Sequence, residues 1–406
     1  MRRYLHVLNT TDFRRLWAGA TVSTLGDGMT FVALSWLVLS GPGGTAALGL
    51  LGICYTAPVL VGGLAVGPLL DRFDKRIVLI ADSLLRAAVV MSVPVTAALG
   101  AMPDWLPFVV AAGYGLLKMV PLAGFPAAIP QLVEEDDLDA ANALESLSFS
   151  LAMVIGPAAA GLLIDRIGAA DVLLVDGVSF LLFALATATV RPLSPATTPG
   201  DRRPSLGFLA RDRVIVGTTV AFMAFNVAVG MLMVTGPWLA GTRLPGGAAA
   251  FGALLSALAV GEMVGAAVAG HGRPGGQPDA ARVRAIGTVQ GAAALAFLAL
   301  LASPRQVPVA AGFFAIGLLS APMTVWAQSL RMRRIPPALH GRAFAGLRTL
   351  MQATPPIGAA LVTPLLVGSH LAVAAVAMTL IAGLPALYLI AGRPVRDSAE
   401  RLGSVG

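Results

Sequence analysis

The chain has 406 residues, of which 57% are hydrophobic and only 12% are charged, and its mean hydropathy is +0.81. A soluble protein carries about 25% charged residues, so this composition excludes an ordinary soluble domain and indicates a polytopic membrane protein. The net charge of +7 is concentrated in the loops between apolar segments, so it does not indicate a nucleic-acid partner.

Apolar segments recur along the whole chain. A helix needs about 20 residues to cross a hydrocarbon core about 30 Å thick. The segments that meet this length are 16–40, 46–70, 77–99, 105–130, 141–164, 171–190, 213–240, 248–270, 284–302, 307–330, 343–367 and 370–391. Because their number is even, both termini are expected on one side of the membrane.

Arginine and lysine predict which side this is. Nearly all of those that lie between spans fall in the loops on the side of the termini, and the opposite loops hold only Arg166, Arg243 and Arg305. Cytoplasmic loops carry the excess of basic residues. We therefore expect a multi-pass protein of the cell (inner, cytoplasmic) membrane with both termini in the cytoplasm.

Residues 191–212 form the longest polar stretch and are rich in proline. They predict an N-terminal six-helix bundle over 1–190, a cytoplasmic linker over 191–212 and a C-terminal six-helix bundle over 213–406. Similar segments, Thr11–Arg15 and Phe208–Arg213, lead into the first and seventh spans. Such an echo favours two pseudo-symmetric bundles around a central cavity.

A charged hinge separates the second and third spans. Five of the six residues from Asp71 to Arg76 are charged, so this segment cannot lie in hydrocarbon and must turn at the membrane surface. The two spans are therefore expected to form a tightly joined hairpin.

The hinge resembles the signature loop between helices 2 and 3 of the major facilitator superfamily. The matching positions are Gly67, Leu69, Asp71, Arg72, Lys75, Arg76 and Leu79. Asp74 stands where that family usually has a second glycine, which predicts a less ideal turn. The resemblance implies an all-α fold of twelve transmembrane helices. It also implies a gate in which the Asp71 carboxylate contacts the start of helix eleven, near residues 342–348.

The fifth span contains Gly156-Pro157 and Gly161. This pattern resembles the Gly-Pro-rich helix-five motif of the superfamily's antiporters, although Ala152 and Ala160 replace expected glycines. That motif is associated with export. The alternative is a kinked, closely packed helix, because Gly-Pro has this effect in any membrane protein.

An ordered set of short segments narrows the resemblance to the branch of macrolide-efflux and enterobactin-export proteins. The segments are Phe13–Trp17, Leu25–Asp27, Ile129–Val133 with Ala141–Leu144, and His340–Phe344. This resemblance implies a secondary active transporter that exports small amphipathic, drug-like or siderophore-like compounds against inward proton flow. The alternatives are an importer of the same fold, or a lipid-translocating or non-transporting membrane scaffold.

Ionisable residues inside the spans are functional candidates, because each costs several kcal/mol in hydrocarbon unless it is paired, protonated or hydrated. We hypothesise that Asp27 and Lys118 pair near the midplane and separate when a proton or substrate binds; the alternative is a permanent structural pair. Lys118 has a second possible role in tuning the charge of the substrate. Glu262 is expected to be either neutral or open to a water-filled cavity, which suits a proton carrier, a site for cationic drugs or a hydrogen bond between helices.

Two further groups complete the predicted site. Asp82 and Arg86 are four residues apart on one helical face and predict a structural ion pair that supports the hinge. The candidates for the cavity wall are Phe31, Asn226, Trp326, Gln328 and Gln352.

Motifs of ATP-driven transport and of hydrolytic or metal enzymes are missing from the sequence. The four histidines are scattered among different loops, so neither a metal site nor enzyme activity is expected. We expect no cofactor other than the proton gradient. The expected partners are a small-molecule substrate and membrane lipid, and we expect a monomer.

Overall fold

A computed structural model describes residues 2–134, 137–193, 210–270, 278–335, 346–347 and 349–391. Within these ranges the chain is helical and has no β-strand. Twelve helical segments are long and apolar enough to cross a membrane, from Thr11–Leu39 to Leu371–Ile390. Each coincides to within a few residues with a predicted span, so the predicted all-α membrane fold is confirmed.

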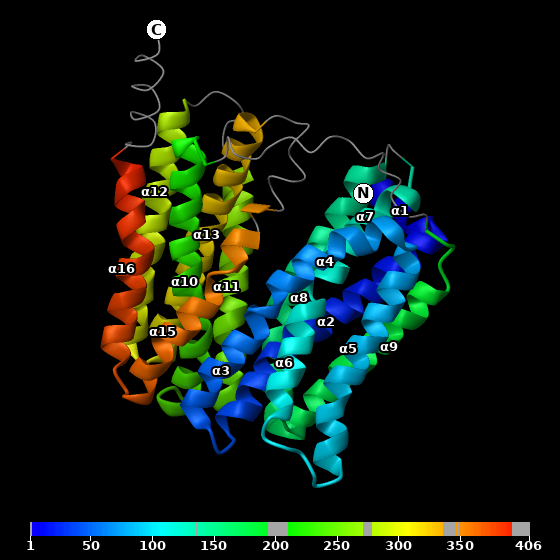
Figure 1. Cartoon of the computed structure of the whole chain (residues 1–406), viewed down its shortest axis with the longest axis horizontal. Coiled ribbons are helices and arrows are strands. Elements are labelled where there is room, and N and C mark those ends of the chain that lie inside the picture. Colours follow the sequence, from blue (N-terminus) through cyan, green and yellow to red (C-terminus); the bar gives the residue numbers. More distant parts are fainter. Residues whose placement is uncertain are drawn as a thin grey trace. The chain divides into compact units, whose positions relative to one another are not determined.

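The chain divides into two compact units (Figure 1). Unit 1 is Met1–Gly200 with Gly246–Ser256, and unit 2 is Asp201–Pro245 with Ala257–Gly406. The boundary near residue 200 lies within the expected linker, whose residues 194–209 fall outside the described ranges. The domain limits 1–190, 191–212 and 213–406 stay predictions.

The helices of unit 1 are α1 (Arg2–Asn9), α2 (Thr11–Leu39), α3 (Gly44–Thr56), α4 (Pro58–Arg72), α5 (Lys75–Ala98), α6 (Leu106–Leu117), α7 (Met119–Ala128), η1 (Ile129–Gln131), α8 (Leu138–Ile167) and α9 (Ala169–Ala188). Helix α2 packs along α8 and α9, and α5 packs along α9. The second span is interrupted between α3 and α4 at Pro58, because proline has no amide hydrogen to continue the helix.

The predicted hinge is the turn from α4 into α5. Phe73 is extended, and Asp74 caps α5 by accepting a hydrogen bond from the Arg76 amide at 2.8 Å. Both Asp74 and Phe73 have negative φ angles, so this turn needs no second glycine, and the expectation of a less ideal turn is wrong. The two spans have different main partners, since α4 packs on α6 and α7 whereas α5 packs on α9.

Several residues of the predicted gate can be placed. Gly67 and Arg72 are exposed on α4, Lys75 is buried, and Arg76 donates to the Ala188 carbonyl at 2.5 Å. The Asp71 side chain and residues 342–345 lie outside the described part of the chain. The contact between Asp71 and helix eleven therefore stays a prediction.

The Gly-Pro motif of α8 lies where two helices cross closely. A Cβ atom built on Gly156 would lie 2.8 Å from the Gly28 Cα atom, and one on Gly161 would lie 2.6 Å from the Ala248 carbonyl oxygen. Pro157 lies within α8, which continues unbroken from Leu138 to Ile167. This geometry supports the packing interpretation of the motif, and its association with export stays a prediction.

The helices of unit 2 are α10 (Arg213–Thr242), α11 (Gly247–Gly270, shared with unit 1), α12 (Asp279–Ala296), η3 (Phe297–Ala302), α13 (Gln306–Arg334), α15 (Pro355–Val367) and α16 (Leu371–Ile390). Helix α10 packs on α15 and α16, and α12 packs on α13 and α16. The buried Gln290 amide ties three of them together by donating to the carbonyls of Ala221 at 2.9 Å and Ala382 at 2.8 Å.

Candidate functional site

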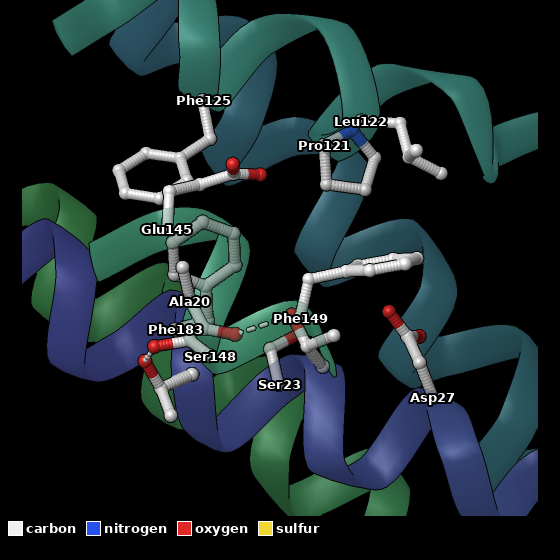
Figure 2. A pocket seen from close by; sticks show the side chains of 12 residues that line it. Ala20, Ser23, Asp27, Pro121, Leu122, Phe125, Glu145, Ser148, Phe149 and Phe183 are labelled. Atoms are coloured by element: carbon white, nitrogen blue, oxygen red, sulfur yellow. Dashed lines mark hydrogen bonds between the residues drawn. The ribbon is translucent and has the colours of Figure 1, made fainter. Parts of the chain in front are cut away.

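Unit 1 contains a pocket bounded by α2, α7, α8 and α9. Its lining combines hydroxyls and two carboxyl groups with aromatic rings. In Figure 2 the Asp27 and Glu145 side chains lie on opposite sides of the pocket. Among the lining residues, the Thr21 hydroxyl is hydrogen-bonded to the Ser148 hydroxyl at 3.1 Å. The pocket therefore offers polar partners along its length.

The size of the pocket limits what it can hold. Its volume is about 50 Å³. A water molecule needs roughly 10–15 Å³ of cavity volume, whereas sites for drug-sized ligands have about 300–1,000 Å³. The pocket can thus admit a few water molecules to Asp27 but not a drug-sized compound.

Arg86 is the centre of a buried ionic cluster next to this pocket. Its side chain is fully buried, and it contacts Asp27 Oδ1 at 2.7 Å and Asp82 Oδ2 at 3.2 Å. The Tyr114 hydroxyl donates to the same Asp27 oxygen at 2.7 Å. Only Asp27 has an appreciable exposed fraction, 18% of its side chain. Asp27 therefore links the pocket to the buried charges.

Aromatic rings surround the cluster. The Arg86 guanidinium carbon lies 4.2 Å from the centre of the Phe180 ring, and Tyr114 stacks on Tyr55 with ring centres 5.2 Å apart. Phe31, predicted as a cavity wall, packs on Tyr55 at 4.9 Å and does not line the pocket. A cation over aromatic faces is attracted by their quadrupoles, which adds to the stability of the charged Arg86.

The predicted ion pair between Asp27 and Lys118 is wrong, because Asp27 has a different partner. Asp27 binds Arg86 and Tyr114, and no ion pair joins Lys118 to a carboxylate among the residues described. Lys118 instead lies between α6 and α7 with its Nζ atom 5.4 Å from the centre of the Tyr55 ring. Arg86 suits this position better than Lys118, because its planar guanidinium can donate to two carboxylates at once.

The predicted contact between Asp82 and Arg86 is present, but its setting differs from the expectation. Arg86 lies about midway along α5, not beside the hinge, and its other end holds Asp27. The pair therefore belongs to the candidate site and does not brace the turn after α4.

Sequence reasoning missed Asp176. This residue lies in the middle of α9 and is fully buried beside Gly26 and Thr30 of α2. The rule that singled out Asp27, an acidic residue within an apolar span, applies equally to Asp176 in the predicted span 171–190.

The candidates in unit 2 do not form a comparable cluster among the described residues. Glu262 is exposed on α11, whereas Asn226 donates to the Met351 carbonyl at 3.2 Å. Trp326, Gln328 and Gln352 are half-buried. In the described part of the chain no three His, Cys, Asp or Glu side chains come together as metal ligands.

In unit 2, the predicted site did not include the buried Arg331. It donates to Thr219 Oγ1 at 3.5 Å and approaches the Met351 sulfur at 3.9 Å. No carboxylate lies within ion-pair distance of it among the residues described. Its position at the end of the tenth predicted span made it look like an ordinary loop cation.

Known transporters resemble this chain in sequence. It is 32% identical over 184 residues to the multidrug efflux pump Tap of Mycolicibacterium fortuitum, a match that covers 44% of each protein. Macrolide efflux protein A of Streptococcus pyogenes is 24% identical over 48% of this chain and 47% of that protein. The matches to these two efflux proteins thus span less than half of their lengths. The uncharacterized MFS-type transporter y4rN of Sinorhizobium fredii is 28% identical over 85% of this chain and 86% of its own.

Solved structures and a family model extend the likeness to nearly the whole chain. The crystal structure of a peptide transporter, POT, in complex with sulfate superposes with a TM-score of 0.75 at 16% identity over 94% of both chains, which shows a shared fold. Together with the sequence relatives, this confirms the resemblance to the major facilitator superfamily and its macrolide-efflux members. Because the model of the transmembrane secretion effector family matches residues 5–397, the chain belongs to that family.

Proposed function

We propose that this protein exports small amphipathic, drug-like molecules in exchange for protons. The observation that carries the proposal is the position of Asp27, whose carboxylate meets a water-sized pocket on one side and the buried Arg86 on the other. The efflux proteins among the relatives support export over the importer and scaffold alternatives.

In this proposal the Asp27 carboxylate alternates between two bonding states. While ionised, it accepts hydrogen bonds from Arg86 and Tyr114 at 2.7 Å each. Protonation removes the charge that holds Arg86, so the contact between α2 and α5 weakens. A change of this kind at one helix pair biases the equilibrium between the inward-open and outward-open states that alternating access requires.

The pocket serves the proton and not the exported molecule. Its size suits water, and its hydroxyl groups and the Glu145 carboxyl give water the polar partners that it needs. Water in the pocket would bring protons to Asp27 while Arg86 and Asp82 stay dry. The exported compound then binds elsewhere, and its identity does not follow from this pocket.

The proposed setting is the cell membrane, with both termini in the cytoplasm. The excess of arginine in the loops on the side of the termini supports this orientation. The proton gradient supplies the driving force, without a bound cofactor, and the working unit is a monomer in lipid. Glu262 and Lys118 remain secondary candidates for proton coupling.

The test is transport of a fluorescent cationic dye in oriented proteoliposomes with and without an imposed pH gradient. We expect gradient-driven dye movement by the intact protein and its loss in Asp27→Asn, which keeps the size of the side chain but not its charge. Exchange of labelled for unlabelled dye, which needs no net proton movement, should persist in the variant.

The matched control is Asp104→Asn, because Asp104 is an exposed carboxylate between α5 and α6. Its transport should equal that of the intact protein. Undiminished gradient-driven transport in Asp27→Asn would exclude Asp27 as the coupling group. Dye movement that ignores the gradient in the intact protein would exclude proton coupling altogether.

A further inference from the structure

Asp176 has an environment unlike that of the other acidic residues that the structure describes in unit 1. Its side chain is fully buried in the middle of α9. One carboxyl oxygen is hydrogen-bonded to the Thr30 hydroxyl of α2, and the other accepts from the Ser179 hydroxyl at 3.2 Å. Among the residues described, no cation lies within ion-pair distance of it. Its partners are therefore neutral.

The backbone of α2 closes one side of the Asp176 carboxyl. A Cβ atom built on Gly26 would come within 3.2 Å of the Asp176 carboxyl carbon and would also collide with Ser179. Glycine at position 26 thus lets the carboxyl lie directly beside the residue that precedes Asp27. The Asp176 carboxyl is therefore shielded from solvent but lies close to Asp27, which lines the pocket.

The charged groups that face Asp176 come from two neighbouring helices. Asp27 faces it from α2 and Arg86 from α5, with Asp82 behind Arg86 and the Tyr114 hydroxyl of α6 bonded to Asp27. From α8, Glu145 lines the pocket, and Asp165 and Arg166 are exposed. Of these groups, Arg86 is the buried guanidinium, and its contacts are with Asp27 and Asp82.

The balance of charge leaves Asp176 uncompensated if it is ionised. The cluster would then hold three carboxylates against the Arg86 guanidinium and the Lys118 ammonium, which interacts with Asp27. One carboxylate would still lack a cation, and a buried ion without a partner costs several kcal/mol. A proton on Asp176 removes this cost. Both of its hydroxyl partners suit either state, because a hydroxyl can donate to a carboxylate and can accept from a protonated carboxyl group.

We propose that Asp176 is a proton-binding site, which holds a proton while Arg86 is bound to Asp27 and passes it to the freed Asp27 carboxylate when Arg86 turns from Asp27 to Asp176. Arg86 is placed for this exchange. Its guanidinium lies over Phe180, one turn beyond Asp176 on α9, and its Nη2 atom has no hydrogen-bond partner in the described part of the chain. The proposal rests on the proposed proton-coupled function and extends it from Asp27 to a second carboxyl.

Infrared spectroscopy of the purified protein in lipid tests this site without a transported substrate. A protonated carboxyl group has a carbonyl stretching band that an ionised carboxylate lacks, and the band shifts in heavy water. We expect such a band at neutral pH in the intact protein, its loss in Asp176→Asn, and its retention in Asp82→Asn and Asp104→Asn.

A second variant keeps the proposal testable if Asp176→Asn folds poorly. Thr30→Val retains the carboxyl but removes one hydroxyl partner, so the band should move in frequency without disappearing. Absence of the band in the intact protein at neutral pH, or its loss in Asp82→Asn but not in Asp176→Asn, would overturn the proposal. Because the spectrum needs no transport, failure of the Asp27 experiment and failure of this one are distinguishable.

Discussion

The two units treat a buried arginine in opposite ways. In unit 1, Arg86 lies midway along α5 and is held by two carboxylates at 2.7 and 3.2 Å. In unit 2, Arg331 is also buried, at 3% exposed, but among the described residues its partners are a hydroxyl, a thioether and the Phe222 ring, with no carboxylate. In the described part of the chain, the same helical architecture thus holds a buried arginine with two carboxylates in one unit and a buried arginine without a carboxylate in the other.

The ion pairs that the structure describes in unit 2 lie at helix ends, not at membrane depth. Arg334, in the last turn of α13, contacts Asp212 at 2.8 Å and Asp279 at 2.5 Å. Partial burial opposes the charge of this guanidinium, but the two carboxylates more than offset it and raise the pKa of Arg334. These pairs fasten the starts of α10 and α12 to the end of α13. The described ion pairs of unit 2 therefore join helix ends, whereas unit 1 also holds an ion-pair cluster within its helices.

Replacement of the two arginines should have opposite effects on stability. Arg86→Met leaves the buried Asp82 and the partly exposed Asp27 without their cation, and breaking a buried ion pair from one side costs about 3–5 kcal/mol. Arg331→Met removes a cation that has no carboxylate partner among the described residues and leaves an apolar side chain of similar length. We expect the apparent melting temperature in detergent micelles to fall steeply for Arg86→Met, and to stay level or rise for Arg331→Met.

The control is the double variant Arg86→Met with Asp27→Asn, which removes one of the stranded charges. Its melting temperature should recover part of the loss, because contacting residues are coupled in such a cycle. Equal destabilisation by Arg86→Met and Arg331→Met would contradict the comparison of the two units.

The sequence predicts the spans well and the ionic cluster only in part. Hydrocarbon leaves the backbone no partner outside the helix, so apolar length alone locates the spans. It does not tell which neighbouring helix supplies the partner of Asp27, and both Arg86 and Lys118 were available. The predicted span 77–99 already puts Arg86 near mid-length, but its contact with Asp82 was interpreted as support for the hinge, whereas the structure shows that Arg86 also binds Asp27.

Asp176 shows a different limit of the sequence. Its importance depends on Gly26, which brings the backbone of α2 against its carboxyl, and on Thr30 and Ser179, which give it neutral partners. These four residues come from two helices that are far apart in the chain. Their meeting is a consequence of packing, which hydropathy does not encode.

A second comparison concerns two glycines of unit 1 that the sequence marked as motif residues. In Gly156→Ala the new methyl group would meet the α2 backbone at Gly28, and overpacking of this kind costs about 1–3 kcal/mol. In Gly67→Ala it would meet nothing within 4 Å, and alanine favours a helix over glycine by up to about 1 kcal/mol. Thermal unfolding in detergent should therefore shift down for the first variant and remain level or shift up for the second.

Transport by Gly67→Ala separates stability from gating. A variant that is as stable as the intact protein but transports the dye more slowly would indicate a role of Gly67 in the gate. A lower melting temperature for Gly67→Ala than for Gly156→Ala would refute the packing interpretation of the helix-five motif.

The smallest effects are expected at two aspartates that cap helices, one in each unit. Asp74 caps α5 and also accepts from the Leu193 amide at 3.1 Å, whereas Asp212 caps α10 and binds Arg334. Loss of an N-cap costs about 0.5–2 kcal/mol, and a partly exposed ion pair adds up to about 1 kcal/mol. Asp212→Ala should therefore destabilise slightly more than Asp74→Ala.

Salt screens the ion pair more than it screens a hydrogen bond between an aspartate and a backbone amide, so the difference between the two variants should shrink when the melting temperatures are measured in 1 M salt. A gap that persisted there would mean that the link from α10 to α13 depends on packing around Arg334 and not on its charge.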